Sequence, residues 1–265
     1  MTPYHFSTGS MPLLISIPHA GTALTAEVEA GLSDAARGLP DTDWHIPLLY
    51  DFARDLGASV LVANYSRFVI DLNRPADDRP LYSTATTGLF PDTLFDGTPT
   101  FQPGKTPTAA QRQGYLTTLW QPYHQQIQQE LARLKQQFGY ALLFDAHSIA
   151  SHIPRLFDGR LPDLNIGTNS GESCHASISE ALIARCTEQS RFSWVLNGRF
   201  KGGYITRAYG QPAQHQHAVQ LELAQCNYMD EQPPFGWCGE RAAELQPLLK
   251  QLIHTLLEQG AQQKR

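Results

Sequence analysis

Short apolar runs bounded by turn-forming residues predict buried strands at several places along the chain. They lie at residues 12–18, 58–65, 140–144, 163–168, 192–197 and 218–223, and residues 66–74 are expected to continue the second of these strands or form another. Apolar residues recur at helical spacing in residues 41–57, 108–138, 174–188 and 239–259. Strands that alternate with helices predict an α/β fold with a mixed, largely parallel central sheet flanked by helices.

The first predicted helix is preceded by residues suited to capping it, namely Asp41, Thr42 and Asp43. Residues 75–107, in contrast, show no hydrophobic period and are rich in Pro, Gly, Thr and Asp. A loop of this length in a compact domain is usually functional, often as a lid or a wall of a site. We find no internal repeat and no linker that divides the chain, so residues 1–265 are expected to form a single domain.

The formal net charge is −5, and neither sign of charge forms a run. This argues against a nucleic-acid partner, because affinity for phosphate backbones comes largely from clustered Lys and Arg. No apolar stretch approaches the length of a bilayer span, and the N-terminus lacks a basic region followed by an apolar run. We therefore expect neither a membrane anchor nor a signal peptide.

The cysteines match no CxxC spacing, and a chain of this length does not need disulfides as staples. The simplest interpretation is a reduced, cytoplasmic protein whose thiols are buried: Cys174, Cys186, Cys226 and Cys238. Three histidines lie in polar or terminal surroundings and are expected at the surface: His5, His124 and His254.

Polar side chains gather where the predicted strands end, which is the edge at which open α/β sheets bind ligands. His19 directly follows the first strand, and a nearby glycine lets the backbone turn closely around a metal. Asp145 and His147 end another strand and lie two residues apart, so they share a face. Either both approach a metal or Asp145 orients a ligand; strand capping by His19 and a metal-free Asp–His hydrogen bond are the competing interpretations.

The segment 66–74 places Arg67, Asp71 and Asn73 on one face if it is a strand. Charged residues in so apolar a run are costly to bury unless they pair or face a ligand. Arg74 carries the planar fork that suits a carboxylate. A purely structural ion pair between Arg67 and Asp71 is the alternative.

Strand 218–223 carries Gln220 and Glu222 on the face opposite its apolar residues. A glutamate in such a strand is expected to have a raised pKa, as a general base near neutrality requires; a salt bridge to an arginine is the alternative. Together these segments supply neutral metal ligands, a base, a cation for an oxyanion and a carboxylate clamp, which are the parts of a metallohydrolase.

Six short motifs, in this order, resemble the N-formylglutamate amidohydrolase family, a relative of zinc carboxypeptidases and aspartoacylases. The motifs are ISIPHAG (15–21), TDW (42–44), SR with DLNRP (66–67 and 71–75), FDAHS (144–148), GGYITR (202–207) and HAVQLE (217–222). The resemblance covers nearly the whole chain. It implies a phosphorylase/hydrolase-like fold of the zinc-exopeptidase type, and hydrolysis of N-formyl-L-glutamate to formate and glutamate at the end of histidine breakdown.

The resemblance further implies a Zn²⁺ cofactor bound by His19 and His147. Relatives of the carboxypeptidase type have a glutamate three residues after the first histidine, where this chain has Thr22. The expected substitute is Asp43, which is also placed to cap a helix, with His45 as the alternative ligand.

The remaining roles that the resemblance implies concern the reaction and a small-molecule substrate. Glu222 matches the general base and Arg67 the residue that polarises the scissile carbonyl. Asn73 and Arg74 match the pair that holds a substrate carboxylate, and Arg207 is expected to contact a second carboxylate.

Two other functions stay open at this point. A deacylase of the aspartoacylase or succinylglutamate type would keep the fold and the metal, but Thr22 in place of the glutamate argues against it. A metal-free protein that binds acidic amino acids would use the arginines, yet it gives no reason for His19, His147 and Glu222 to lie at strand ends. The sequence does not fix the oligomeric state.

Overall fold

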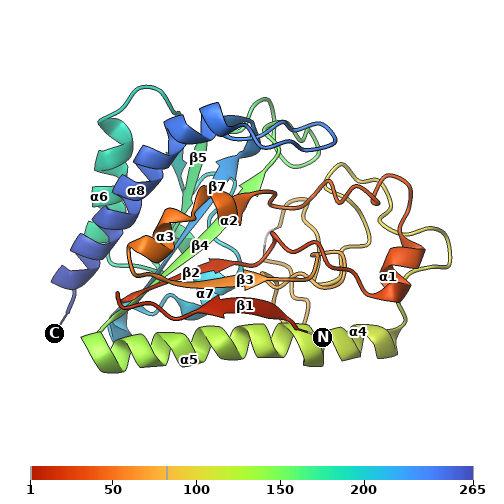
Figure 1. Cartoon of the computed structure of the whole chain (residues 1–265), viewed down its shortest axis with the longest axis horizontal. Helices are drawn as coiled ribbons and strands as arrows, with labels where there is room; N and C mark the ends of the chain where they lie inside the picture. The colour runs from red at the N-terminus through yellow and green to blue at the C-terminus, as the bar shows by residue number, and fades with distance from the viewer. Residues whose placement is uncertain (1, 82, 265) are drawn as a thin grey trace.

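Within the part of the chain that the structure describes, seven strands form one sheet in the order β1-β3-β2-β4-β7-β5-β6 (Figure 1). The computed structural model describes residues 2–81 and 83–264. The strands are β1 (Tyr4–Ser7), β2 (Leu13–Ile17), β3 (Ser59–Ala63), β4 (Ala141–Ile149), β5 (Leu164–Gly167), β6 (Trp194–Leu196) and β7 (Gln216–Ala224). All six predicted apolar strands are therefore confirmed, and β1 is an additional one.

The central strands β3, β2, β4 and β7 run parallel, while β1 and β5 pair antiparallel with their neighbours and β6 runs parallel to β5. The mixed, mostly parallel sheet is thus confirmed. Every residue of β2, β4 and β7 is buried. Strands covered on both faces have no solvated side, which explains why they read as continuous apolar runs.

Helices cover both faces of the sheet (Figure 1). One face carries α4 (Ala109–Tyr115), the π-helical turn η1 (Leu116–Trp120), α5 (Gln121–Phe138) and α7 (Tyr204–Tyr209), with α1 (Ala26–Gly31) contributing to the same core. The other face carries α2 (Ile46–Leu49), α3 (Phe52–Asp55), α6 (Ala176–Thr187) and α8 (Gly239–Gln262). Short 3-10 turns are η2 (Asn169–Gly171), η3 (Pro212–Gln214) and η4 (Gln225–Asn227).

Alternation along the central strands divides the apolar side chains between two cores. In β2, Leu13 and Ile15 belong to the core beneath α6 and α8, whereas Leu14 belongs to the core beneath α5. In β4, Phe144 and Leu143 divide in the same way. The site described below lies at the carboxyl end of these strands, beyond both cores.

The long predicted helices are confirmed, with α5 continuing from α4 through η1. Thr108 and Gln111 form a capping box at the start, because the Thr108 hydroxyl accepts from Gln111 N and the Gln111 side chain accepts from Thr108 N. Gly139 ends α5 in the left-handed conformation with φ 83°. The helices at 174–188 and 239–259 appear as α6 and α8.

The expectation of one helix over residues 41–57 is wrong. His45 adopts a left-handed conformation with φ 61°, and Tyr50 departs from helical angles, so the segment forms only the short helices α2 and α3.

The strand expected at residues 66–74 is also absent. Its apolar side chains are all buried in the core beneath α5, so the segment has no exposed face that alternates with a buried one: Phe68, Val69, Ile70 and Leu72. Backbone hydrogen bonds from Val69 N to Ser66 O and from Arg74 N to Asp71 O close turns instead. The apolar run reflects burial on every side and not sheet pairing.

Residues 75–107, as far as they are described, form an irregular loop with only isolated bridges, as expected. Two surface predictions need correction. His124 is buried and stacked on Trp120, with the ring centroids 3.8 Å apart. It lies on the inner face of α5, where its ring nitrogens contact Leu72 O and the Tyr209 hydroxyl. Cys174 and Cys186 are buried, but Cys226 and Cys238 are only partly so, since they lie in and beside the surface turn η4. Among the described helices, none is long and apolar enough to cross a membrane.

Candidate metal centre and active site

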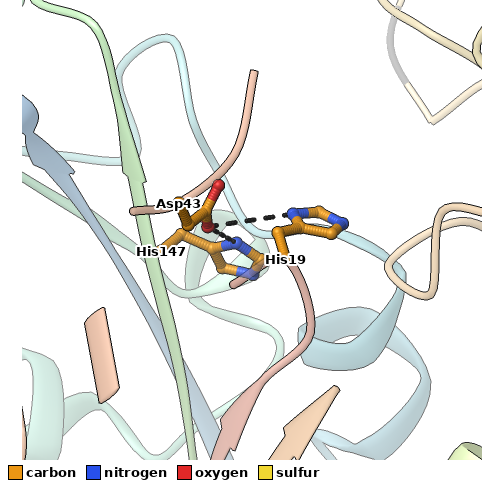
Figure 2. Close-up of side chains that lie close together, drawn as sticks. All are labelled: His19, Asp43 and His147. Atoms are coloured by element: carbon orange, nitrogen blue, oxygen red, sulfur yellow. Dashed lines mark hydrogen bonds and ion pairs between the residues drawn. The ribbon is translucent and has the colours of Figure 1, made fainter. Parts of the chain in front are cut away.

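The structure brings His19, Asp43 and His147 together, although His147 lies more than a hundred residues beyond Asp43. His147 projects from β4, His19 follows β2 and Asp43 lies in the loop before α2 (Figure 2). Asp43 Oδ2 is 2.9 Å from His147 Nδ1 and 3.8 Å from His19 Nδ1. All three side chains are buried.

Backbone contacts fix Asp43 beside the two histidines. Asp43 N donates to His19 O at 3.0 Å, and Ser148 N donates to Asp43 Oδ2 at 3.2 Å. The N-cap position of α2 is His45, so Asp43 does not cap that helix. His45 Nε2 donates to Phe235 O at 2.7 Å, and His45 is not part of the cluster.

Carboxylates hold the far side of each imidazole. His19 Nε2 lies 2.6 Å from Asp71 Oδ1, and His147 Nε2 lies 2.9 Å from Asp145 Oδ2. Because a carboxylate accepts, a proton on each Nε2 is donated to its carboxylate, and Nδ1 is then the nitrogen that would hold a metal. Of the two roles left open for Asp145, this geometry favours orienting the ligand His147.

The surroundings push the two histidines in opposite directions. Burial and the Arg67 guanidinium lower the pKa of His19. Burial also acts to lower the pKa of His147, but the carboxylates of Asp145 and Asp43 raise it well above its ordinary value. The raised pKa means that His147 holds a second proton, on Nδ1. A divalent metal ion bound by His19 Nδ1, Asp43 Oδ2 and His147 Nδ1 would replace that proton.

The donor set fits a divalent metal ion. Two imidazole nitrogens and one carboxylate oxygen are the ligand types of catalytic zinc sites, which leave further positions for water or substrate. Ligand atoms at about 2.1 Å from one tetrahedral ion lie about 3.4 Å apart, which is between the 2.9 and 3.8 Å that separate Asp43 Oδ2 from the two Nδ1 atoms. Asp145 Oδ1 is buried with no hydrogen-bond partner among the described atoms, so negative charge is left close to the cluster.

Glu222 lies directly opposite His147 in the pairing of β4 with β7. Its neighbour on the same face, Gln220, donates from Nε2 to Glu222 Oε2 at 3.2 Å. Burial raises the pKa of Glu222 to about 7, with opposing contributions from His147, which lowers it, and Asp43, which raises it. The glutamate is thus able to gain and lose a proton near neutrality.

Arg67 both pairs with a carboxylate and faces the site. Its Nη2 lies 2.7 Å from Asp71 Oδ2, its Nη1 lies 4.0 Å from Asp43 Oδ1, and its guanidinium lies 4.6 Å from the Phe95 ring centroid. Burial acts against the charge of Asp71, but His19 and Arg67 hold the pKa of this carboxyl well below its usual value. Asp71 therefore links the metal-facing His19 to the cation beside it.

A cavity enclosing about 530 Å³, solvent at its mouth included, opens onto these groups. Six of the predicted site residues line it: His19, Arg67, Asn73, Arg74, His147 and Glu222. The rest of the wall comes from the long loop and from strand ends: Thr86, Thr87, Phe95, Ile149, Leu156, Arg199, Phe200, Gly203 and Gln220.

Asn73 and Arg74 are held in place by neighbouring groups. Asn73 Nδ2 donates to Asp145 Oδ2 at 3.1 Å, and Asn73 Oδ1 accepts from Ile205 N at 2.8 Å. Arg74 Nε donates to Thr87 O at 2.8 Å. Asn73 thus supports the Asp145 carboxylate behind His147, while Arg74 presents its guanidinium beside the loop wall.

The structure does not bring Arg207 to the cavity. Its Nε donates to Gly202 O at 2.8 Å and its Nη1 to Leu81 O at 3.2 Å. Arg199, which sequence reasoning passed over, lines the cavity instead. The available signal was its position just after strand 192–197, the same kind of position that singled out His19.

The comparisons with known proteins agree with one another. Residues 11–229 match the sequence profile of a family described as N-formylglutamate amidohydrolase. The chain is 62% identical over 255 residues to a protein of Pseudomonas aeruginosa named N-formylglutamate deformylase, with 96% of each chain covered. It is 60% identical over 257 residues to a protein of Pseudomonas putida with the same name, covering 97% of this chain and 96% of that protein.

Two solved structures share the fold. A crystal structure of N-formylglutamate amidohydrolase from Ralstonia eutropha superposes with a TM-score of 0.83 at 23% identity and covers 100% of this chain and 99% of that one. A gene product of Agrobacterium tumefaciens superposes with a TM-score of 0.71 at 16% identity, covering 97% of this chain and 94% of its own.

Proposed function

This chain belongs to the N-formylglutamate amidohydrolase family, and we propose that it hydrolyses N-formyl-L-glutamate to formate and L-glutamate. The relatives with 62% and 60% identity are named for this deformylation. The observation that carries the proposal is the buried cluster of His19, Asp43 and His147, whose two histidines line one cavity together with Glu222. The resemblance also implies that this reaction is the last step of histidine breakdown, and that assignment stays a prediction.

We propose Zn²⁺ as the cofactor, held by His19 Nδ1, Asp43 Oδ2 and His147 Nδ1. When bound, the ion supplies Lewis-acid chemistry, which makes water more acidic and a carbonyl carbon more electrophilic. Asp71 and Asp145 keep the two imidazoles in the tautomer and orientation that this requires.

Glu222 is the proposed general base and then the general acid. It accepts a proton from the attacking water, whose oxygen bonds to the formyl carbon. As the C–N bond breaks, Glu222 returns a proton to the departing amine of glutamate. A carboxyl with a pKa raised to about 7 suits both transfers.

Arg67 is proposed to stabilise the negative charge that develops on the formyl oxygen. Its guanidinium lines the cavity and is anchored by Asp71 and Phe95, so it need not reorganise during the reaction. A preorganised donor of this kind is worth about 3 kcal/mol to the transition state.

Arg74 is proposed to bind the α-carboxylate of the substrate through its planar fork. Asn73, its neighbour at the cavity wall, is proposed to assist through its amide. A formyl group offers little to recognise, so the selectivity of the enzyme must come from the glutamyl part of the substrate.

The proposal is tested by formate release from N-formyl-L-glutamate before chelation, after thorough chelation and after zinc is restored. Activity that is lost with chelator and regained with zinc is expected. Activity indifferent to complete removal of metal would contradict the zinc mechanism. N-acetyl-L-aspartate and N-succinyl-L-glutamate run in parallel; release of acetate or succinate, with no formate from metal-loaded protein, would point to the other deacylases.

A further inference from the structure

The cavity wall carries a third arginine, Arg199, in the turn that follows β6. Its Nε donates to Leu156 O at 2.8 Å, and its guanidinium lies 5.3 Å from the Phe200 ring centroid. Leu156, Phe200 and Ile149 all line the same cavity. The guanidinium is therefore held at a wall whose neighbouring surface is apolar.

Arg74 and Arg199 reach the same short stretch of the long loop from two different segments of the fold. Arg74 donates to Thr87 O at 2.8 Å, and Arg199 Nη2 donates to Ala85 O at 2.6 Å. Carbonyl oxygens two residues apart are separated by at most about 7 Å, which places the two guanidinium groups at most about 12 Å apart.

This upper limit leaves room for a dicarboxylate ligand between the two guanidinium groups. The two carboxyl carbons of a glutamate residue are separated by three carbons and lie about 5 Å apart when extended. A guanidinium nitrogen about 3 Å beyond each carboxylate oxygen then requires a pair of arginines close to the upper limit that their contacts with the loop set. The methylene groups between the carboxylates require an apolar wall, which Leu156, Phe200 and Ile149 supply.

We propose that Arg199 is the specificity-determining residue that binds the side-chain carboxylate of the substrate, while Arg74 binds the α-carboxylate. The inference rests on the proposed function, and it assigns to Arg199 the contact that the sequence motif had suggested for Arg207. Because Leu156 O and Ala85 O already orient the guanidinium, little side-chain entropy is lost when it binds the substrate.

The test compares N-formyl-L-glutamate with N-formyl-L-glutamine, which has the same shape but a neutral side-chain amide. Wild-type enzyme should prefer the glutamate substrate by about 10²-fold or more in kcat/KM, because a site built for a charged group rejects an analogue that lacks it. Arg199→Gln should reduce kcat/KM for N-formyl-L-glutamate by about 10²-fold and for N-formyl-L-glutamine by less than about 10-fold. The preference of the enzyme for N-formyl-L-glutamate over N-formyl-L-glutamine is then largely lost.

Three further variants separate recognition from a structural role. Arg74→Gln should reduce kcat/KM for both substrates by the same factor, since both carry the α-carboxylate. Arg191→Gln, at an exposed arginine paired with Glu244 away from the cavity, should leave both unchanged. Arg199→Met keeps the bulk of the side chain but not its charge, and it should likewise abolish the preference for N-formyl-L-glutamate. This variant provides an independent measurement if Arg199→Gln does not fold.

Several outcomes overturn the assignment. Equal losses for both substrates in both Arg199 variants would make the residue a support for the loop only. Collapse of the preference in Arg207→Gln but not in the Arg199 variants would restore the motif-based assignment. A wild-type enzyme that cleaves both substrates equally well defeats the inference alone, whereas no formate from either substrate defeats the proposed function with it.

Discussion

Each histidine of the candidate metal centre is held between two carboxylates, one at each ring nitrogen. For His147 these are Asp43 at Nδ1 and Asp145 at Nε2, both at 2.9 Å. The first carboxylate is a proposed ligand, and the second fixes the proton on the far nitrogen. Loss of the second should therefore weaken metal binding without removing any donor atom.

We predict that Asp145→Asn lowers zinc affinity about 10- to 100-fold, because the amide no longer enforces the tautomer and ring orientation of His147. Competition with a chelating dye measures this directly. Asp163→Asn is the matched control: it removes a buried carboxylate that is bonded to Ser193 and Arg160, residues that do not line the cavity. Unchanged zinc affinity in Asp145→Asn would show that the carboxylate has no influence on the ligand.

Glu222 is predicted to act on protons and not on the metal. Glu222→Gln should lower kcat by at least about 10²-fold, since the amide cannot accept the proton of water. Metal content, measured by atomic absorption, should stay at the wild-type level. Loss of metal in this variant would instead make Glu222 a ligand.

Residues in or just after predicted strands could be found from the sequence because an apolar run followed by a polar group is a local signal. His19, His147 and Glu222 all have it. The bond between Asp71 and His19 and the entry of Arg199 into the cavity depend on turns whose conformation is set by tertiary packing. No local pattern reports such turns.

The turn between β6 and α7 positions the site through a close backbone approach. Gly203 N donates to Gln220 Oε1 at 2.7 Å, and a Cβ at this position would lie 2.4 Å from Asn73 Nδ2. Asn73 is the residue that holds the Asp145 carboxylate. A side chain at residue 203 must therefore displace a group that supports the metal centre.

We predict that Gly203→Ala reduces kcat/KM about 10- to 100-fold, because small displacements of positioned groups are costly to catalysis. Gly114→Ala is the control, since a Cβ there meets no atom within 4 Å. That change should stabilise α4 by about 0.5 to 1 kcal/mol and leave kcat/KM unaltered. Equal activity in the two variants would show that the Asn73 contact does not matter.

Among the elements, the strands and long helices were predictable because their periodicity extends over several turns or is bounded by prolines and glycines. Residues 41–57 and 66–74 were not. The first carries helical spacing but is broken by the left-handed His45. In the second, residues on both faces of the expected strand are buried, so the alternation of polar and apolar residues did not indicate a strand.

At the scale of the whole molecule, two histidines outside the site couple stability to pH. Burial lowers the pKa of His124 and that of His217 to about 4. As the pH falls, the imidazoles of His124 and His217 take up a proton near pH 6.5 in the unfolded chain, but only near pH 4 in the folded chain. Between these values the unfolded state holds more protons, so stability is lost as the pH falls.

We predict that His124 contributes a loss of about 2 kcal/mol to the free energy of unfolding between pH 7 and pH 5, while the raised pKa of Glu222 contributes in the opposite direction. Urea denaturation at the two pH values measures it. On going from pH 7 to pH 5, His124→Gln should lose about 2 kcal/mol less stability than the wild type, whereas His5→Gln, at an exposed histidine, should behave as the wild type does. A slope that is the same in His124→Gln and wild type would contradict the assignment.

The parallel order of β2, β4 and β7 has a consequence for how the protein is made. The groups at the site come from residues 19, 43, 147 and 222, and each strand that delivers one is separated from the next by a crossover. A nascent chain leaving the ribosome lacks His147 until β4 has been synthesised, and it lacks Glu222, the proposed base, until β7 follows. Hydrolytic capacity therefore arrives late in synthesis, after most of the chain has emerged, and truncated products of interrupted translation carry none.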